Sequence, residues 1–441
     1  MIDFSQYKID ELCEFINGFA FKSGDYVEKS ADTLEVFRMG YIARGGGFKE
    51  DSTPVFVPKS YGKDLSKYLL RKDDVLIAMT DMKNNVAILA NTARIKDEDR
   101  FVLNQRVGCL RVKDDNLLDP TFFYFYSNFK PHVEYLRSRA NSGVQVNLST
   151  SSIKEAEILV PPLSEQKTIA SVLGALDDKI ENNRRMNETL EEMARAIFKS
   201  WFVDFDPVQA KASGNAPAHM DADTAALFPS SFGDDGLPAG WNENELTKYA
   251  TLNSKSHNAR NAPEEVWYAD LANTKNGKIE SFDHYLWGDA PSRAKRILQE
   301  GDTIVGTVRP GNCSFAYIGK SECPITGSTG FAVLTPTQKE FREFIYCAAT
   351  SNENIDRLAH LADGAAYPAV KPNIVSETLV SISDEKLIFA FHLQTVSLLT
   401  KVITNIAENQ TLTELRDTLL PKLMSGEIRV TDAEQEVEAA I

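Results

Sequence analysis

A long apolar seam with asparagines in its middle is the feature that most constrains the fold of this 441-residue chain. Between residues 169 and 201, hydrophobic positions recur at alternating steps of four and three. This heptad spacing is typical of a helix that packs lengthwise against another helix. Two seam positions, Asn183 and Asn187, are amides. Because a buried amide costs stability unless it finds a hydrogen-bonding partner, the seam predicts a partner helix with matching polar groups.

The same pattern returns 222 residues further along the chain, where Asn405 aligns with Asn183 and Asn409 aligns with Asn187. An internal repeat of this kind indicates a duplicated unit. If the two helices pair antiparallel, matching Asn183 with Asn409 also matches Asn187 with Asn405, so the four amides would fix the register. The alternative interpretation is that Asn183 and Asn187 lie on a hydrated helix edge.

Short β-branched runs flank the helices and predict globular units of the α/β (α+β) class. The segment "KDDVLIAMT" from Lys72 resembles "EGDTIVGTV" from Glu300, so the duplication extends into these units. We therefore expect a tandem of globular unit and long helix with a pseudo-two-fold internal repeat. The predicted boundaries are globular units at 1–162 and 241–384, helices at 163–205 and 385–426 that form an antiparallel coiled coil, a linker at 206–240 and an acidic tail at 427–441.

Composition narrows the class of protein further. No run of about 18 apolar residues is present, and the first residues lack a basic start before an apolar core. We therefore expect neither a membrane span nor a secretory signal. Five scattered cysteines form no Cys-x-x-Cys pair. This pattern favours a reducing cytoplasm over a disulfide framework or a zinc site.

The net charge of −15 would by itself disfavour a nucleic-acid-binding protein. The excess of acids is concentrated, however, because residues 206–240 and 427–441 each hold five acidic residues against one basic residue. Residues 1–162 are close to neutral, with 22 basic and 23 acidic residues. If the protein binds DNA, we expect partner proteins to supply much of the attraction for phosphate.

Known catalytic motifs are missing from the sequence. It has no Asn-Pro-Pro-aromatic or Asp-Pro-Pro-Tyr segment for amino methylation, no Gly-x4-Gly-Lys-Ser/Thr loop for a nucleotide, and no histidines at metal-ligand spacing. We therefore expect no catalytic residue, no metal and no cofactor in this chain. A fused enzyme with disguised motifs is a less favoured alternative.

Four segments resemble the DNA sequence-specificity subunit of type I restriction-modification enzymes. The family's central conserved region is similar to "VPPLSEQKTIASVLGALDDKIENNRRMNETLEEMARAIFKSWFVDFDPV". The entries of its two target-recognition domains are similar to "INGFAFKSGDY" and "LPAGW", and its C-terminal conserved end is similar to "LRDTLLPKLMSGEIRV".

The resemblance implies a non-catalytic subunit of a DNA methylation and restriction system. Its two target-recognition domains would each read one half of a split site in double-stranded DNA. The helices would dock two methyltransferase subunits, which use S-adenosylmethionine, and restriction/motor subunits would join for cleavage. The alternative of a different class is a coiled-coil scaffold that binds other proteins and does not bind DNA.

Two duplicated turns are the first candidates for reading bases. Each follows a strand-like run and combines a basic residue with amides: Lys83 with Asn84 and Asn85, and Arg309 with Asn312. Arginine and lysine suit guanine edges, and asparagine suits adenine edges. The alternative is a solvated hairpin turn, because asparagine and glycine form turns on their own account.

Other basic and amide residues are weaker candidates for DNA contacts. Arg44 and Lys49 surround three glycines that would let the backbone approach a phosphate. The remaining candidates are Gln105, Arg106, Lys275, Asn276, Lys278, Arg293, Lys295 and Arg296. For each of these, an ordinary exposed surface position is the simpler explanation. The aromatic run "TFFYFY" from Thr121 predicts helix core rather than a platform for stacking bases.

Overall fold

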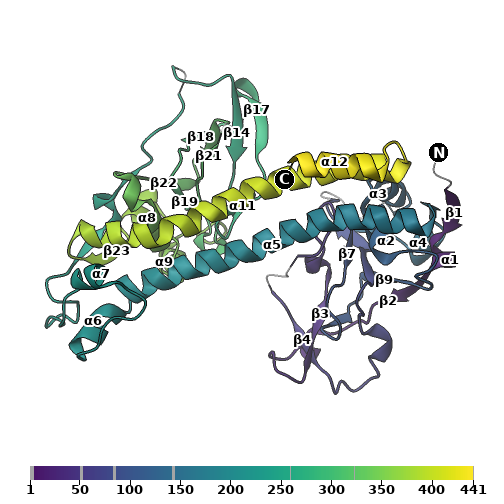
Figure 1. Cartoon of the computed structure of the whole chain (residues 1–441), viewed down its shortest axis with the longest axis horizontal. Helices are drawn as coiled ribbons and strands as arrows, with labels where there is room; N and C mark the ends of the chain where they lie inside the picture. The colour runs from purple at the N-terminus through teal and green to yellow at the C-terminus, as the bar shows by residue number, and fades with distance from the viewer. Residues whose placement is uncertain are drawn as a thin grey trace. The chain divides into compact units, whose positions relative to one another are not determined.

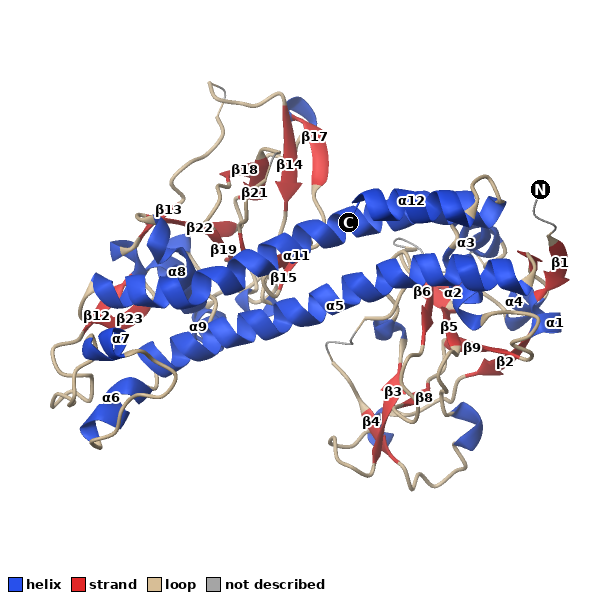
Figure 2. Cartoon of the chain, in the orientation of Figure 1, coloured by secondary structure: helices blue, strands red, loops and turns tan. Residues whose placement is uncertain are grey.

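The computed structural model describes residues 4–49, 53–82, 86–141, 145–258, 260–321 and 323–440. The chain divides into two compact units (Figure 1). Unit 1 comprises Met1–Glu181 with Glu408–Ile441, and unit 2 comprises Asn182–Ala407. Each unit mixes small β-sheets with short helices (Figure 2) and contains part of both long helices, α5 (Leu163–Phe202) and α11 (Glu385–Ser425). This architecture confirms the predicted α/β (α+β) fold class.

Unit 1 is built on an antiparallel four-stranded sheet of order β2-β9-β5-β7. All four residues of β5 are buried, as its continuous apolar run predicts. A three-stranded sheet of order β4-β3-β8 and the pairs β1-β11 and β10-β6 complete the strands of the unit. The bounds are β1 Ser5–Lys8, β2 Cys13–Asn17, β3 Thr33–Phe37, β4 Phe56–Pro58, β5 Val75–Ala78, β6 Thr80–Met82, β7 Thr92–Arg94, β8 Phe101–Leu103, β9 Val107–Val112, β10 Gln145–Asn147 and β11 Glu157–Val160.

The helices of unit 1 pack their apolar residues against this sheet. Helix α2 begins with Pro120, and the Asp119 carboxylate accepts a hydrogen bond from the Phe122 N–H at 2.9 Å, which is a regular N-cap. Residues 122–126 are all buried aromatics, so the prediction of helix core for this run is confirmed. The bounds are α1 Ile9–Leu12, α2 Pro120–Asn128, α3 Lys130–Ser138, α4 Thr150–Lys154 and α12 Val430–Ala440, with short 3-10 turns η1 Ser23–Asp25, η2 Met39–Tyr41 and η3 Ser66–Tyr68.

Unit 2 repeats the topology of unit 1. Its sheet β13-β22-β19-β20 has the antiparallel order of the unit 1 sheet, and its parallel pair β14-β21 corresponds to the parallel pair β3-β8. The bounds are β12 Asn242–Glu245, β13 Ala250–Leu252, β14 Glu265–Ala269, β15 Thr274–Lys275, β16 Lys278–Ile279, β17 Asp283–Leu286, β18 Ala294–Ile297, β19 Thr303–Gly306, β20 Phe315–Tyr317, β21 Ile325–Ser328, β22 Phe331–Pro336 and β23 Leu379–Ile382.

The helices of unit 2 include two in the segment that was predicted as a linker, α6 and α7. Val208 and Phe228 of this segment are buried in the core of the unit. In the acidic tail of unit 1, α12 likewise buries Val430 and Ala433. The bounds are α6 Asp206–Ala212, α7 Ala222–Ala226, α8 Arg342–Ala349, α9 Asn352–Leu361 and α10 Pro372–Ser376, with 3-10 turns η4 Leu246–Lys248, η5 Trp287–Asp289, η6 Pro310–Asn312 and η7 Lys339–Phe341.

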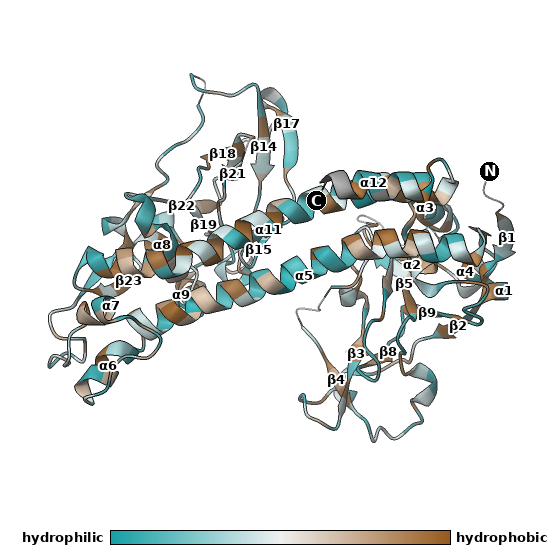
Figure 3. Ribbon diagram, viewed as in Figure 1, coloured by the Kyte–Doolittle hydropathy of each residue, from teal (hydrophilic) through white to brown (hydrophobic). Residues whose placement is uncertain are grey.

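The long helices pair within each unit. In unit 1, Asp177 forms an ion pair with Arg416 at 2.8 Å, and the Asn409 amide donates to the Ile180 carbonyl at 3.3 Å. In unit 2, the ring of Phe198 lies 6.0 Å from that of Phe391. In each unit the residue numbers rise along α5 as they fall along α11, so the pairing is antiparallel. Figure 3 shows hydrophobic and hydrophilic bands alternating along both helices, as a buried seam requires.

One described helix, α11, is long and apolar enough to cross a membrane, with a mean hydropathy of 1.5 over its most apolar window. The expectation that no helix is apolar enough to span a membrane rested on uninterrupted apolar runs. In α11, uncharged polar residues such as Gln394 interrupt the apolar run but leave the mean hydropathy high. A single helix of this kind is weak evidence for a membrane span, since core helices have the same composition. The apolar residues Leu387, Phe391 and Leu399 of α11 are buried in the core of unit 2.

Candidate nucleic-acid interface

In unit 1, a junction of three chain segments positions the exposed turn between β8 and β9. The Met79 N–H donates to the Arg106 carbonyl at 3.0 Å, and the Leu148 N–H donates to the Met79 carbonyl at 2.8 Å. Gln105 and Arg106 occupy the turn and are both exposed. Neither side chain has a hydrogen bond or ion pair within the described part of the chain. The structure therefore leaves both predicted residues available to a ligand.

A small hollow beside this turn contains amides that the sequence analysis missed. The hollow measures about 240 Å³, and Asn17 and Asn147 line it together with Gln105 and Arg106. Asn17 ends β2, whereas Asn147 ends β10, far along the sequence. No local pattern singles out either residue, because only strand pairing brings them to the same place. Lys83, Asn84 and Asn85, which follow β6, lie outside the described residues.

The glycine run between Arg44 and Lys49 has a structural reason of its own. A Cβ on Gly46 would lie 2.2 Å from the Asn128 side chain, and the Gly47 N–H donates to the Thr92 carbonyl at 2.8 Å. Two of the glycines therefore pack against the body of unit 1, which weakens the argument that they approach a phosphate. Arg44 and Lys49 are exposed and have no side-chain partner in the ranges that the structure describes.

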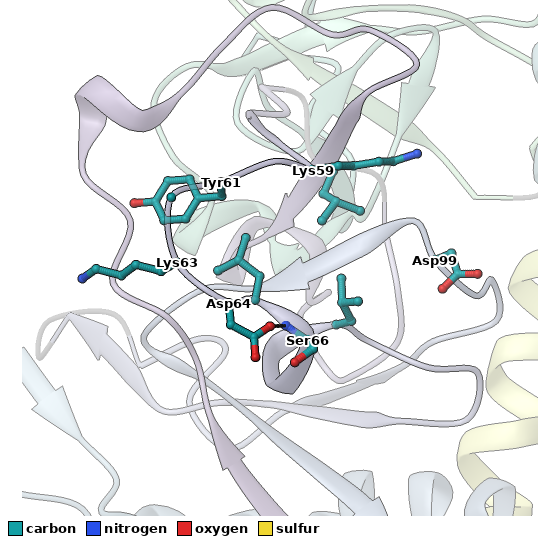
Figure 4. Close-up of a pocket in the computed structure, with 10 residues that line it drawn as sticks. Lys59, Tyr61, Lys63, Asp64, Ser66 and Asp99 are labelled. Carbon is teal, nitrogen blue, oxygen red and sulfur yellow. Dashed lines mark hydrogen bonds between the residues drawn. The ribbon is translucent and has the colours of Figure 1, made fainter.

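A larger hollow of about 810 Å³ lies elsewhere in unit 1 (Figure 4). It carries charges of both signs, with Lys59 and Lys63 opposed by Asp64 and Asp99. Hydrogen bonds from Ser66 hold the pKa of Asp64 below its ordinary value, so this carboxylate stays ionised. The mixed charge makes this hollow a poorer site for a polyanion than the amide-lined one.

In unit 2, Arg309 lies in the turn that follows β19, directly before η6. Its backbone is left-handed, with φ 48°, and its N–H donates to the Pro368 carbonyl at 2.7 Å. The guanidinium donates to the Ala366 carbonyl at 2.8 Å and stacks over the Tyr367 ring, 4.9 Å from its centroid. Tyr367 is 72% exposed, so the pair presents a cation and an aromatic face to solvent. Sequence analysis identified Arg309 and missed Tyr367.

The hairpin of β15 and β16 brings further predicted residues to this turn. The Asn276 N–H donates to the Cys313 carbonyl at 2.8 Å, directly after the exposed Asn312. Lys275 and Lys278 flank Asn276 and are exposed. Although the residue as a whole is exposed, desolvation around its ammonium group and, to a smaller extent, the neighbouring charge of Arg184 lower the pKa of Lys278. The structure therefore gathers most of the predicted cations and amides of unit 2 at one corner.

Two of the remaining candidates of unit 2 have partners inside the unit. The Arg293 guanidinium donates to the Tyr268 hydroxyl and to the Asp270 carboxylate, both at 2.9 Å. Arg296 donates to the Ser256 hydroxyl at 3.2 Å. Lys295, by contrast, is exposed and has no side-chain partner among the residues described. The partners of Arg293 and Arg296 give these two residues a structural role apart from any ligand.

The asparagines of the helix seam lie close to the centre of the long helices. Asn183 is 2% exposed and Asn405 is fully buried. The Asn405 amide donates to the Asn187 side-chain oxygen at 2.8 Å, and the Asn187 amide donates to the Val402 carbonyl at 3.4 Å. Asn409 reaches the Ile180 carbonyl in unit 1. That these amides set the register stays a prediction.

A family model and two relatives that match this chain are all described as specificity domains or subunits of type I restriction enzymes. Residues 1–192 match the family described as the type I restriction modification DNA specificity domain. The HindI specificity subunit of Haemophilus influenzae is 25% identical over 420 residues, which cover 83% of this chain and 89% of the relative. The MjaIX specificity subunit of Methanocaldococcus jannaschii is 27% identical over 331 residues, which cover 73% of this chain and 72% of the relative.

A solved structure has a fold similar to that of this chain. The crystal structure of the S subunit of a type I restriction-modification system from M. genitalium matches with a TM-score of 0.55 at 19% identity, over 96% of both chains. Its likeness to this chain concerns the fold. The family match over residues 1–192 and the two relatives show that the chain is similar to the specificity subunits of type I restriction-modification enzymes.

Proposed function

We propose that this chain reads a split DNA sequence, one half-site per unit, as the recognition subunit of a type I restriction-modification complex. The repeated topology carries the proposal. Both units have a four-stranded antiparallel sheet of the same order, β2-β9-β5-β7 in unit 1 and β13-β22-β19-β20 in unit 2. Each unit also has an exposed basic side chain in a turn beside this sheet, Arg106 in unit 1 and, at a different turn, Arg309 in unit 2. A duplicated frame with different exposed residues suits the reading of two different half-sites.

The partners of this subunit would carry the chemistry. We propose that two methyltransferase subunits dock on it, that they bind S-adenosylmethionine, and that restriction/motor subunits complete the assembly. The missing amino-methyltransferase and nucleotide-loop motifs support a chain that is non-catalytic by itself. The scattered cysteines support a cytoplasmic location.

Methylation sequencing tests the proposal most directly. Deletion of the gene should remove one split methylated motif from the host genome, and its return on a plasmid should restore that motif. The purified chain should transfer no methyl group, and any DNA binding should weaken steeply with salt because phosphate contacts release counterions. Methyl transfer by the isolated chain, or a methylome unchanged by the deletion, would contradict the proposal.

A further inference from the structure

We propose that the amide-lined hollow of unit 1 reads purine edges of the first half-site, with Arg106 taking a guanine and the amides taking an adenine. This inference rests on the proposed function and deepens it. The polar residues that line the hollow are Asn17, Thr80, Gln105, Arg106 and Asn147. Three of them, Asn17, Thr80 and Asn147, have no place among the residues that the sequence singles out.

The end of β2 and the turn between β8 and β9 are brought together by a close approach of their backbones. A Cβ on Gly18 would lie 1.9 Å from the Asn104 carbonyl oxygen, so no other residue fits there without movement. The Phe19 N–H donates to the Leu103 carbonyl at 2.9 Å, and the Gln105 N–H donates to the Phe19 carbonyl at 2.8 Å. The end of β2 is therefore fixed against the turn, which places Asn17 and Gln105 at one hollow.

The pairing of β6 with β10 brings a third part of the chain, the end of β10, to the hollow. β6 and β10 pair antiparallel, with Thr80 opposite Asn147. Leu148 follows Asn147 and is hydrogen-bonded to Met79, which in turn is hydrogen-bonded to the Arg106 carbonyl. The walls of the hollow are thus held by backbone hydrogen bonds, so its side chains need not hold the fold together.

The side chains of the hollow keep unused hydrogen-bonding groups. Gln105 and Arg106 have no side-chain partner within the residues that the structure describes. The Asn17 oxygen accepts a hydrogen bond from the Thr150 hydroxyl at 3.1 Å, which orients the amide. Arg106 has φ 74°, a left-handed conformation that favours glycine. An arginine held at such a position indicates that its side chain serves a purpose other than folding.

Unit 2 has the same backbone hydrogen bonds around the corresponding position, but it carries different side chains there. We call this shared backbone arrangement the frame. There the Thr307 N–H donates to the Gly330 carbonyl at 2.8 Å, and the Val370 N–H donates to the Thr307 carbonyl at 2.9 Å. These bonds repeat those of Met79, so Gly330 is equivalent to Arg106 and Thr329 to Gln105. The bridge between Val308 and Ala369 repeats the pair Thr80–Asn147.

Four polar residues of the hollow, Thr80, Gln105, Arg106 and Asn147, therefore have smaller or apolar counterparts on the same backbone of unit 2, namely Val308, Thr329, Gly330 and Ala369. Residues needed for the frame itself would be needed in both units. Their divergence assigns them to a ligand that differs between the units, which is what two half-sites provide. Bidentate contacts of arginine to guanine O6 and N7, and of glutamine or asparagine to adenine N6 and N7, match the groups available.

Unit 2 also supplies the variants for the test, Arg106→Gly and Gln105→Thr, because its frame carries these residues. The complex of full-length chain and methyltransferase subunits is assembled with each variant. We expect Arg106→Gly to relax one guanine of one half-site in the methylated motif and to leave the other half-site unchanged. Binding to a duplex with the wild-type motif should weaken about 5- to 150-fold. Gln105→Thr should relax a neighbouring adenine.

Two controls separate base reading from other roles. The melting temperature of Arg106→Gly should be equal to or above that of the wild type, because glycine relieves the left-handed backbone. Arg71→Ala removes another exposed arginine of unit 1 that lies outside the hollow, and it should leave the motif unchanged.

The possible failures are distinguishable. An unchanged motif and unchanged affinity in both hollow variants would overturn this inference and leave the proposed function standing. Equal weakening on all DNA sequences with an unchanged motif would also overturn it, since that result indicates phosphate contacts. If the wild-type complex methylates no split motif, the proposed function itself fails.

Discussion

Two equivalent aspartates have different partners in the two units. Asp74 is 2% exposed and forms an ion pair with Arg111, 2.7 Å away. Asp302 directly precedes β19, just as Asp74 directly precedes β5. The register of the neighbouring strand places Thr335 beside Asp302, at the position that Arg111 occupies in unit 1. Asp302 is fully buried, and burial raises its pKa to about 6. An ionised carboxylate is therefore costly in unit 2, whereas in unit 1 an arginine compensates it.

Asp302→Asn should stabilise unit 2 at pH 8. The pKa is about 6 in the folded state against an ordinary value of 3.8, so the folded state binds more protons between these values and stability falls as pH rises through them. Above pH 6 the cost reaches about 3 kcal/mol, which an uncharged amide avoids. The melting temperature of the variant should exceed that of the wild type at pH 8, and the difference should shrink towards pH 4.

Asp74→Asn is the matched control for this prediction. It removes a carboxylate that Arg111 pairs, and leaves that guanidinium without its partner, so we expect a loss of about 2 kcal/mol or more at pH 8. If both variants shifted the melting temperature in the same direction, the difference between the two aspartates would not come from their partners.

His132 makes unit 1 sensitive to acid. It is 6% exposed within α3, beside the Tyr126 ring, and burial lowers its pKa from 6.5 to about 4. The unfolded chain therefore binds a proton that the folded state excludes between pH 6.5 and 4, and stability falls as the pH falls through this range. At pH 5 the loss is about 2 kcal/mol relative to pH 8.

His132→Phe should remove this part of the acid sensitivity and keep an aromatic ring in place. Denaturation of both proteins at pH 8 and at pH 5 gives the change in unfolding free energy between the two pH values. This change should be about 2 kcal/mol smaller in the variant than in the wild type. An identical pH dependence in both proteins would mean that folding does not lower the pKa of His132.

At the scale of elements, the long helices combine an apolar seam with a polar centre. Asn405 is fully buried and its amide nitrogen is paired with Asn187, while its oxygen has no hydrogen-bond partner in the structure as described. Such an amide pair is less stabilising than two leucines, but it disfavours any register that would bury one amide alone. We therefore expect the seam to favour one alignment of α5 and α11 within unit 2 at some cost in stability.

A double-mutant cycle at Asn187 and Asn405 tests this pairing. Each single change to leucine leaves one amide against an apolar side chain and should cost about 1–2 kcal/mol. The double change removes both amides and should restore stability to the wild-type level or above it. Urea denaturation gives the four free energies, and a coupling below about 0.5 kcal/mol would show that the two amides act independently. Asn182→Leu, at an exposed position, is the control and should show no coupling to Asn405.

At the scale of the whole molecule, one topology occurs twice with different surface chemistry. Unit 1 presents an amide-lined hollow at Gln105 and Arg106, and unit 2 presents the stacked pair of Arg309 and Tyr367. Each unit has its own core and its own sheets. Changes at the turn of one unit should therefore leave the other unit folded and its half-site unchanged.

Arg309→Ala combined with Asn312→Ala should alter one half-site of the methylated motif. Arg309 stacks on an exposed ring and Asn312 is exposed, so their removal should cost little stability and lower affinity by about 1–3 kcal/mol per lost base contact. Methylation sequencing measures the motif. Relaxed bases in both half-sites, or in neither, would show that this turn does not read bases. Lys295→Ala, which removes an exposed cation outside the turn, serves as the control.

The sequence by itself determined the long helices and the duplication. The helices were predicted at 163–205 and 385–426, and α5 and α11 span Leu163–Phe202 and Glu385–Ser425. Heptad periodicity is a local property, because residues three and four apart face the same side of one helix. For the same reason the aromatic run of α2 was predicted as core from its sequence alone.

Only the tertiary structure decided which polar side chains are available to a ligand. Arg293 and Arg106 look alike in sequence, yet Asp270 and Tyr268 bind the first while the second has no side-chain partner within the described ranges. Asn17 and Asn147 meet Gln105 through strand pairing between distant segments. Such pairing depends on the register of whole sheets, which no short stretch of sequence encodes.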